Sequence, residues 1–148
     1  MATASDAALI TTHRAKMFRE MGRGDDALLA EMSRHFEPWV AERLGDGRYL
    51  GWIAEENGRA VAGAGLYLMD WPPHALDPAS ETRGYLLNVW VEPEFRGRGV
   101  AKALTRECME ECARRGIGVM TLHASDAGRP VYEGLGFAAG NEMIWRKA

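Results

Sequence analysis

The first third of the chain carries apolar residues at helical spacing. A helix is predicted over residues 7–21, ended by Gly22 and Gly24, and its apolar face holds Leu9, Ile10, His13, Met17 and Phe18. A second helix is expected to begin at Asp25 or Asp26, with an apolar side of Leu28, Leu29, Met32, Phe36 and Val40. Pro38 lies within it, so a kink or break is expected there.

The pattern then becomes that of β-strands. Residues 49–54 and 60–69 flank Glu56-Asn57-Gly58, and Asn-Gly is the favoured two-residue hairpin turn. Residues 71–80 are predicted to form a loop, because two consecutive prolines remove two backbone donors. The near-continuous apolar run of residues 85–91 predicts a strand buried on both faces.

Helices and strands alternate in the remaining sequence. Residues 100–115 form a predicted amphipathic helix whose buried stripe is Val100, Ala101, Leu104, Cys108 and Cys112. A buried strand over 119–123, a short helix over 128–135 and a last strand from Met143 to Arg146 complete the prediction. This order indicates an α/β fold with a mixed, mostly antiparallel sheet and helices on both faces.

Composition excludes several classes of protein. The 148 residues suit a single domain over 1–148, and the net charge of −3 does not favour a nucleic-acid binder. No apolar run approaches the ~20 residues that span a membrane, and Met1 to Asp6 lacks a signal-peptide core. A cytoplasmic protein with no nucleic-acid or membrane partner is therefore predicted. Cys108 and Cys112 are interpreted as reduced core residues, with no metal site.

The loop between residues 91 and 100 has the chemistry of an anion site. A buried strand ends at Pro93, two glycines follow, and a helix begins at once, so free helix N–H groups meet backbone that can approach a ligand closely. From Arg96 to Arg115, six basic residues outnumber three acidic ones. A diphosphate is the predicted ligand. The loop matches neither the P-loop nor the dinucleotide-binding pattern.

Two motifs resemble those of the GNAT N-acetyltransferases. The run from Arg96 and Arg98 to Gly99 and Ala101 resembles the Arg/Gln-x-x-Gly-x-Gly/Ala signature, and it follows Val91-x-Pro93, which is similar to the same family. Tyr132-Glu133-Gly134-Leu135-Gly136-Phe137 is similar to the family's Tyr-x-x-x-Gly-Phe. The resemblance covers residues 49–147, and residues 7–44 resemble the helical pair that covers the acceptor site.

This resemblance implies an acetyl-CoA-dependent N-acetyltransferase without a metal. The sheet would splay between the strand ending at Val91 and the strand ending near His123. The cofactor-binding residues that it implies are Val89, Trp90, Val91, Arg96, Gly97, Arg98, Gly99, Val100, Ala101, Lys102 and Ser125. Pantetheine would pair with backbone around Val89 and Val91, and the pyrophosphate would sit on the amides of Gly97 to Lys102. Either Ser125 or Asp126 occupies the place of an asparagine common in relatives.

The resemblance also implies catalytic roles. Tyr132 would act as general acid on the departing thiolate, since a phenol and a thiolate have comparable basicity. His123 is a candidate general base, although a structural histidine is the simpler interpretation. The acceptor would be a primary amine of a small molecule or a peptide, and relatives are often homodimers. Two alternatives stay open: a non-catalytic acyl-CoA-binding module, and a transferase of longer acyl groups.

Overall fold

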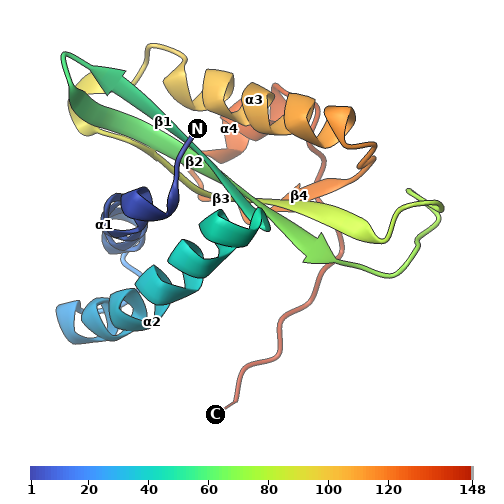
Figure 1. Cartoon of the computed structure of the whole chain (residues 1–148), viewed down its shortest axis with the longest axis horizontal. Coiled ribbons are helices and arrows are strands. Elements are labelled where there is room, and N and C mark those ends of the chain that lie inside the picture. Colours follow the sequence, from blue (N-terminus) through green and yellow to red (C-terminus); the bar gives the residue numbers. More distant parts are fainter. Residues whose placement is uncertain (148) are drawn as a thin grey trace.

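The computed structural model describes residues 1–147 and shows one sheet between two layers of helices (Figure 1). The helices are η1 (Ala4–Asp6, a 3₁₀ helix), α1 (Ala7–Glu20), α2 (Asp26–Asp46), η2 (Pro93–Phe95, a 3₁₀ helix), α3 (Val100–Arg114) and α4 (Arg129–Glu133). The strands are β1 (Tyr49–Glu56), β2 (Arg59–Asp70), β3 (Thr82–Val91) and β4 (Met120–Leu122). The mixed sheet and its two helical layers confirm the predicted fold class.

The four strands lie in the order β1-β2-β3-β4. The first three are antiparallel, and β4 runs parallel to β3. The predicted hairpin turn is confirmed, because both central residues have positive φ (52° at Asn57 and 75° at Gly58), as the two-residue turn between β1 and β2 requires. Pro72 and Pro73 lie in a loop, as expected.

Strand β3 contains a β-bulge that alters which side chains face which helices. Gly63 pairs with Trp90 and Gly65 with Leu87, so β3 has one more residue than β2 between these pairs. Asn88 lies in the bulge with φ of 55°. As a result, Leu87 and Asn88 both face the α1–α2 layer. The bulge falls at the point where β3 loses its neighbour on the other side.

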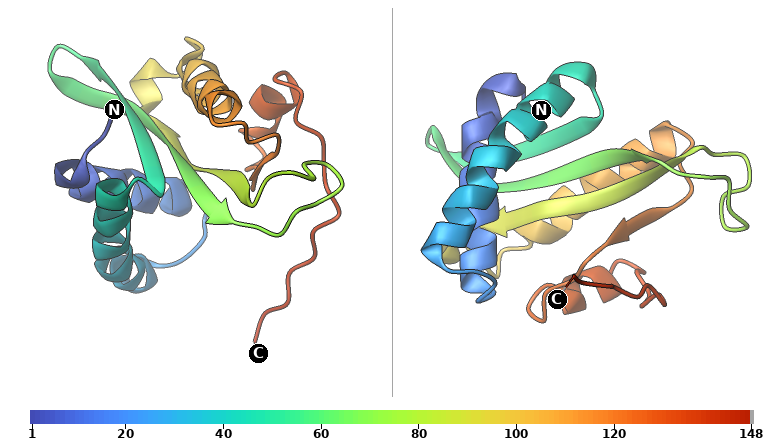
Figure 2. Two further views of the ribbon diagram at one scale, coloured as in Figure 1. Left: turned by 45° about the vertical axis from the view of Figure 1, so that its right-hand side comes forward. Right: turned by 90° about the horizontal axis from the view of Figure 1, so that it is seen from below.

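The sheet opens where the sequence predicted a splay. Strand β4 pairs only with residues 84–86 of β3. In residues 1–147, the part of β3 from Leu87 to Val91 has no strand on that side, and its backbone is available to a ligand there. Figure 2 shows β3 and β4 diverging from this point.

Two hydrophobic clusters hold the layers together. One lies under α3 and includes Leu66, Leu86, Leu104 and Cys108, with α4 packed at its edge through Tyr132. The other lies under α1 and α2 and includes Ala7, Ile10, Phe36, Val40 and Tyr49. The helical pair therefore covers one sheet face, and α3 with α4 covers the opposite face.

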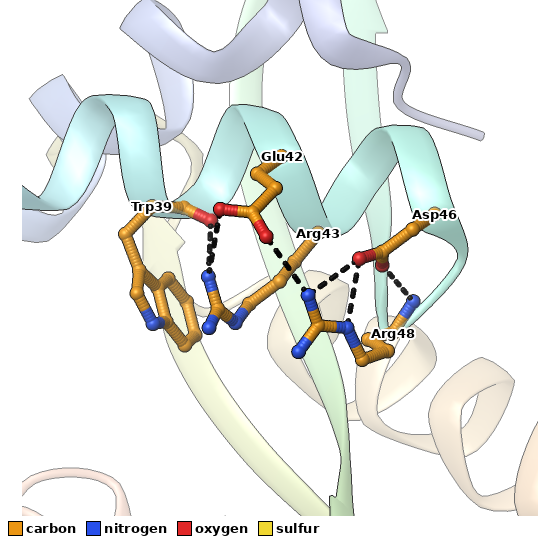
Figure 3. A network of polar contacts seen from close by, with 5 residues as sticks. All are labelled: Trp39, Glu42, Arg43, Asp46 and Arg48. Atoms are coloured by element: carbon orange, nitrogen blue, oxygen red, sulfur yellow. Dashed lines mark hydrogen bonds and ion pairs between the residues drawn. The ribbon is translucent and has the colours of Figure 1, made fainter.

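Helix α2 passes through Pro38 without interruption, so the predicted break is wrong. Phe36 and Val40 are buried on either side of the proline, and their packing offsets the lost backbone hydrogen bond. The end of the helix is held by a polar network, in which Arg48 pairs with Glu42 and Asp46 at 3.1 and 2.5 Å (Figure 3).

The predicted last strand from Met143 to Arg146 is also wrong. Residues 138–147 form no helix or strand, and Figure 1 shows this segment leading away from the rest of the molecule. Strand β4 is shorter than predicted, and its residues are half-buried rather than buried. Both differences have one physical cause: strand propensity states what a segment prefers, whereas a strand forms only where a partner supplies its hydrogen bonds.

Candidate active site

The loop from β3 to α3 is fixed by three ion pairs. Lys16 contacts Glu92 at 2.5 Å, Arg59 contacts Glu94 at 2.8 Å, and Arg96 contacts Glu20 at 2.6 Å. These partners come from α1 and β2, so the loop is tied both to the first helix and to the sheet. Individual surface pairs contribute little free energy, but together they restrict the path of the loop.

Two glycines shape the start of α3. Gly97 and Gly99 have φ of 73° and 78°, a left-handed conformation that L side chains rarely adopt. A Cβ placed on either glycine would meet no atom within 4 Å, so the backbone faces open space. Helix α3 begins directly at Val100, and its first N–H groups have no partner within the helix. An anionic group fits this position.

The three predicted phosphate cations differ in their surroundings. The Arg96 guanidinium is held by both carboxylate oxygens of Glu20, and its Nε donates to the Val91 carbonyl at 3.0 Å. Arg98 donates to the carbonyl of Glu94 at 3.1 Å and keeps an exposed side chain. Lys102 is exposed and forms no ion pair within residues 1–147. Arg98 and Lys102 are therefore better placed than Arg96 to turn toward a phosphate.

The remaining predicted cofactor contacts lie on β3, on the first turn of α3 and before α4. Val89 and Val91 are on the unpaired side of β3 and pack toward α3, and Val100 and Ala101 follow in the first turn of that helix. Trp90 points to the opposite face, where its ring lies 5.0 Å below the Arg96 guanidinium. The hydroxyl of Ser125 accepts a hydrogen bond from the Gly128 N–H at 3.1 Å, which stabilises the turn before α4.

Tyr132 lies on α4 against the α3 side of the gap. Its ring packs on the cluster under α3, and the Phe137 ring meets it edge-on at 5.9 Å. Burial raises the pKa of the Tyr132 phenol. The phenol is therefore protonated at neutral pH and can donate a proton.

His123 lies on the other face of the sheet, in a chain of three polar side chains. Its Nδ1 is hydrogen-bonded to the hydroxyl of Tyr85, and its Nε2 lies 3.1 Å from Glu142 Oε1. The Glu142 carboxylate can only accept a hydrogen bond, so Nε2 carries the proton when His123 is neutral. The unprotonated Nδ1 then accepts a hydrogen bond from the Tyr85 hydroxyl. Sequence reasoning missed Tyr85 and Glu142, since neither lies in a recognisable motif and they are far apart along the chain.

A second polar cluster lies beside this chain, beneath α1. Arg14 Nη1 donates to Asn88 Oδ1 at 2.8 Å, and Asn88 Nδ2 donates to the Tyr49 hydroxyl at 2.9 Å. The Arg14 guanidinium also lies over the rings of Phe18 and Phe36 at 4.8 and 4.7 Å. Burial lowers the pKa of Arg14, and among residues 1–147 no carboxylate pairs with it. This cluster fixes the bulge at the opening of the sheet.

The two cysteines are free and buried. Burial raises the pKa of Cys108 to about 12 and that of Cys112 to about 11. Such thiols carry almost no thiolate at neutral pH and are poor nucleophiles.

Two other kinds of feature are absent from the described part of the chain. No helix within residues 1–147 is long and apolar enough to cross a membrane. Nor do His, Cys, Asp and Glu side chains gather there in a group that could hold a metal ion.

Comparison with known proteins agrees with this architecture. The model of the acetyltransferase (GNAT) family matches residues 13–137. The ribosomal protein bS18-alanine N-acetyltransferase of Escherichia coli K12 is 31% identical over an alignment of 124 positions, and the match covers 79% of this chain and 74% of that protein.

Two solved structures are similar over almost the whole chain. A GCN5-related N-acetyltransferase from Ralstonia eutropha JMP134 has 41% identity and a TM-score of 0.94, and the match covers 99% of this chain and 95% of that one. An acetyltransferase solved with acetyl-CoA, from Clostridium acetobutylicum, has 27% identity and a TM-score of 0.90, covering 99% and 92%. Both of these structures are of acetyltransferases, a class of group-transfer enzymes, and the fold of this chain matches theirs. The chain belongs to the acetyltransferase (GNAT) family.

Proposed function

We propose that the protein transfers the acetyl group of acetyl-CoA directly to a primary amine. The observation that carries this proposal is the sheet opening between β3 and β4, bordered at one end by the Gly97–Gly99 loop and the start of α3. A long cosubstrate with a pyrophosphate fits such a site: the pyrophosphate meets the helix N-terminus, and the extended pantetheine arm pairs with unpaired strand backbone. The Clostridium relative with acetyl-CoA supports this assignment.

The two faces of the opening supply different chemistry. Tyr132 lies on the α3 side, whereas Tyr85 and His123 lie on the α1–α2 side. In the proposed reaction the amine approaches from the α1–α2 side and attacks the thioester carbonyl. The C–N bond forms, the C–S bond breaks, and the departing sulfur takes the Tyr132 proton. A backbone N–H near Val89 or Val91 polarises the carbonyl oxygen.

The proton lost by the amine needs an acceptor on the same side. His123 is oriented by Glu142 and receives the Tyr85 hydroxyl proton at Nδ1. Tyr85 therefore passes a proton from the amine to His123, in the manner of a nucleophile–base pair oriented by a third group. This arrangement extends the base role predicted for His123 by one residue, Tyr85.

The acceptor is a primary amine of a small molecule or a peptide N-terminus. Relatives with both kinds of acceptor in their names match this chain: a ribosomal-protein alanine N-acetyltransferase, and a glucosamine 6-phosphate N-acetyltransferase from Trypanosoma brucei brucei that is 38% identical over 56 residues. The shorter match covers 38% of this chain, so it weighs less.

Acetylation of an amine panel tests the proposal. Small amines, amino acids and peptides with free N-termini are incubated with the protein and acetyl-CoA, and thiol release is followed together with product mass. We expect thiol release and one added acetyl group for at least one acceptor class. Tight acetyl-CoA binding with no transfer to any class would favour the non-catalytic module. Faster reaction with longer acyl-CoA thioesters would favour a transferase of other acyl groups.

A further inference from the structure

Arg14 on α1 is a half-buried cation that has no anion beside it within residues 1–147. The titratable groups that act on it most are the phenols of Tyr49 and Tyr85. Burial raises the pKa of both phenols, so both are neutral at neutral pH. Burial lowers the pKa of the guanidinium, but an arginine stays protonated at neutral pH. A desolvated charge without a partner opposes folding, and such a group in a cleft marks a candidate functional site.

The Arg14 guanidinium has hydrogen-bond donors that the protein leaves unused. Nη1 donates to Asn88 Oδ1 at 2.8 Å. Within residues 1–147 neither Nε nor Nη2 has a hydrogen-bond partner, and of these two atoms Nη2 is the one that is not fully buried. Nε–H and Nη2–H lie on the same edge of the planar group and point in the same direction. Two parallel donors on one edge are the geometry that binds both oxygens of a carboxylate.

This edge of Arg14 is held in a fixed direction. The guanidinium lies over the rings of Phe18 and Phe36 at 4.8 and 4.7 Å, and Asn88 holds its Nη1. Asn88 is itself fixed, because its Nδ2 donates to the Tyr49 hydroxyl at 2.9 Å. A side chain that is ordered in advance loses little conformational entropy when it binds an anion. The contacts that hold Arg14 therefore favour a ligand bound in one orientation.

Arg14 meets the sheet at the opening between β3 and β4. Its partner Asn88 lies in the stretch of β3 from Leu87 to Val91, which has no strand on the β4 side within residues 1–147. Tyr85 lies on the same face of the sheet, and the charge of Arg14 acts on its phenol. The groups proposed to take the proton of the amine, Tyr85 and His123, are therefore on the same side of the opening as Arg14.

Two other arginines share some features of Arg14 but not its position. Arg43 and Arg83 also have a buried Nε without a partner, and each lies over a tryptophan ring. Arg43 donates to the Trp39 carbonyl at 3.1 Å and lies 3.7 Å from a carboxylate oxygen of Glu42 (Figure 3). Arg83 precedes the residues of β3 that pair with β4, so it lies at the far end of that pairing from the opening. Of the three, Arg14 alone combines an unused edge with a place at the opening.

We infer that Arg14 binds a carboxylate of the acceptor, which is therefore a small amine that carries one, such as a free amino acid. The assignment rests on the proposed function, because it names the acceptor of that reaction. One guanidinium neutralises one negative charge, which favours a carboxylate over a phosphate dianion. The ion pair forms where the surrounding protein excludes most water, so it is stronger than a surface pair and orients the amine toward the thioester.

Acetylation of matched acceptors gives the first test. Each amino acid is compared with its carboxamide, which keeps the amine but has no negative charge. In the wild type, kcat/KM should favour the amino acid by at least about 100-fold, because a site built to bind one polar group strongly rejects an analogue that lacks it. Arg14→Gln should remove this preference, mainly by raising KM for the amino acid. Arg14→Lys keeps the charge but not the two-donor edge, so its preference should lie between the two.

Arg43→Gln is the matched control, since Arg43 also lies over an aromatic ring with a buried Nε. It should keep the wild-type preference. A loss of stability or of catalytic power lowers kcat/KM for both members of a pair alike, so a purely structural role of Arg14 leaves their ratio unchanged. The wild-type ratio needs no variant and tests the inference even if Arg14→Gln does not fold.

Binding separates this inference from the proposed function. Calorimetric titration of the CoA complex with each amino acid and its carboxamide requires no transfer. Amino-acid binding that depends on Arg14, with no transfer to any amine, would support the carboxylate site and contradict the proposed function. Transfer with equal kcat/KM for both members of every pair, or a preference that survives in Arg14→Gln, overturns the inference and leaves the proposed function intact. Neither binding nor transfer would overturn both.

Discussion

Tyr132, the proposed general acid, is held in place without a charged partner. Its ring packs against Phe137 and the cluster under α3, so its position is set by apolar contacts. No hydrogen bond holds its hydroxyl within residues 1–147, which leaves the proton available. Removing the hydroxyl alone should therefore separate chemistry from packing.

Tyr132→Phe should lower kcat by about 10²–10⁴-fold, the usual contribution of a general acid. The acetyl-CoA dissociation constant and the unfolding temperature should stay close to wild type. The pKa of the buried phenol is raised, so wild-type activity should fall only above about pH 10, where the proton is lost. That alkaline limb should be absent from the variant. An unchanged kcat with chemistry rate-limiting would make Tyr132 a packing residue.

The bulge in strand β3 depends on Asn88, whose left-handed backbone is rare in strands. Asn88 combines a left-handed backbone with two side-chain hydrogen bonds, a part-buried one from Arg14 and a buried one to Tyr49. Asn57 has nearly the same φ (52° against 55°) but lies exposed in the hairpin turn. Comparing substitutions at Asn88 and Asn57 therefore separates the cost of backbone strain from the loss of side-chain hydrogen bonds.

Substitution of Asn88 by glycine and by alanine should give two distinct losses of stability. Both remove the buried hydrogen bonds and should cost about 2–4 kcal/mol, because Tyr49 and Arg14 lose partners. Alanine should cost about 1 kcal/mol more than glycine, because the left-handed backbone at position 88 is strained for any residue with a Cβ. At Asn57, denaturant unfolding should show only the difference of about 1 kcal/mol between the alanine and glycine variants. If Asn88→Gly is as stable as wild type, the side chain does not hold the bulge.

Elements were predictable from the sequence where their signals are local. The hairpin follows from Asn57-Gly58, and α3 follows from an apolar stripe whose core members Leu104, Cys108 and Cys112 are buried. The glycine loop before α3 was likewise visible in the sequence. Local signals could not show that Glu20 would pair with Arg96, since these residues lie far apart in sequence and meet only when α1 docks on the sheet.

The candidate site was predictable to a similar extent. The motif residues Gly97, Gly99 and Tyr132 border the opening, as expected. The α1–α2 side of the opening was less visible, because Arg14 on α1 meets Tyr85 and Asn88 on β3 only in the folded chain and none of the three carries a motif. The last strand was wrongly predicted for a related reason: the sequence states the preference of Met143–Arg146 but not the partner that would satisfy it.

At the scale of the whole molecule, the sheet is strongly paired at one end and weakly paired at the other. β1 and β2 form eight residue pairs, whereas β4 is three residues long and half-buried. The weakly paired end contains the opening between β3 and β4, which forms the proposed acetyl-CoA site.

Acetyl-CoA binding at the loop before α3 is tested most directly by two matched glycine substitutions. Gly99 and Gly47 have φ of 78° and 81°, and at both positions an added Cβ would meet no atom within 4 Å. Alanine at either position should therefore cost the same backbone strain, about 1–2 kcal/mol. Titration calorimetry should show that Gly99→Ala weakens acetyl-CoA binding by at least about tenfold, or 1.4 kcal/mol, whereas Gly47→Ala leaves it unchanged. Equal affinity in the two folded variants would mean that the pyrophosphate binds elsewhere.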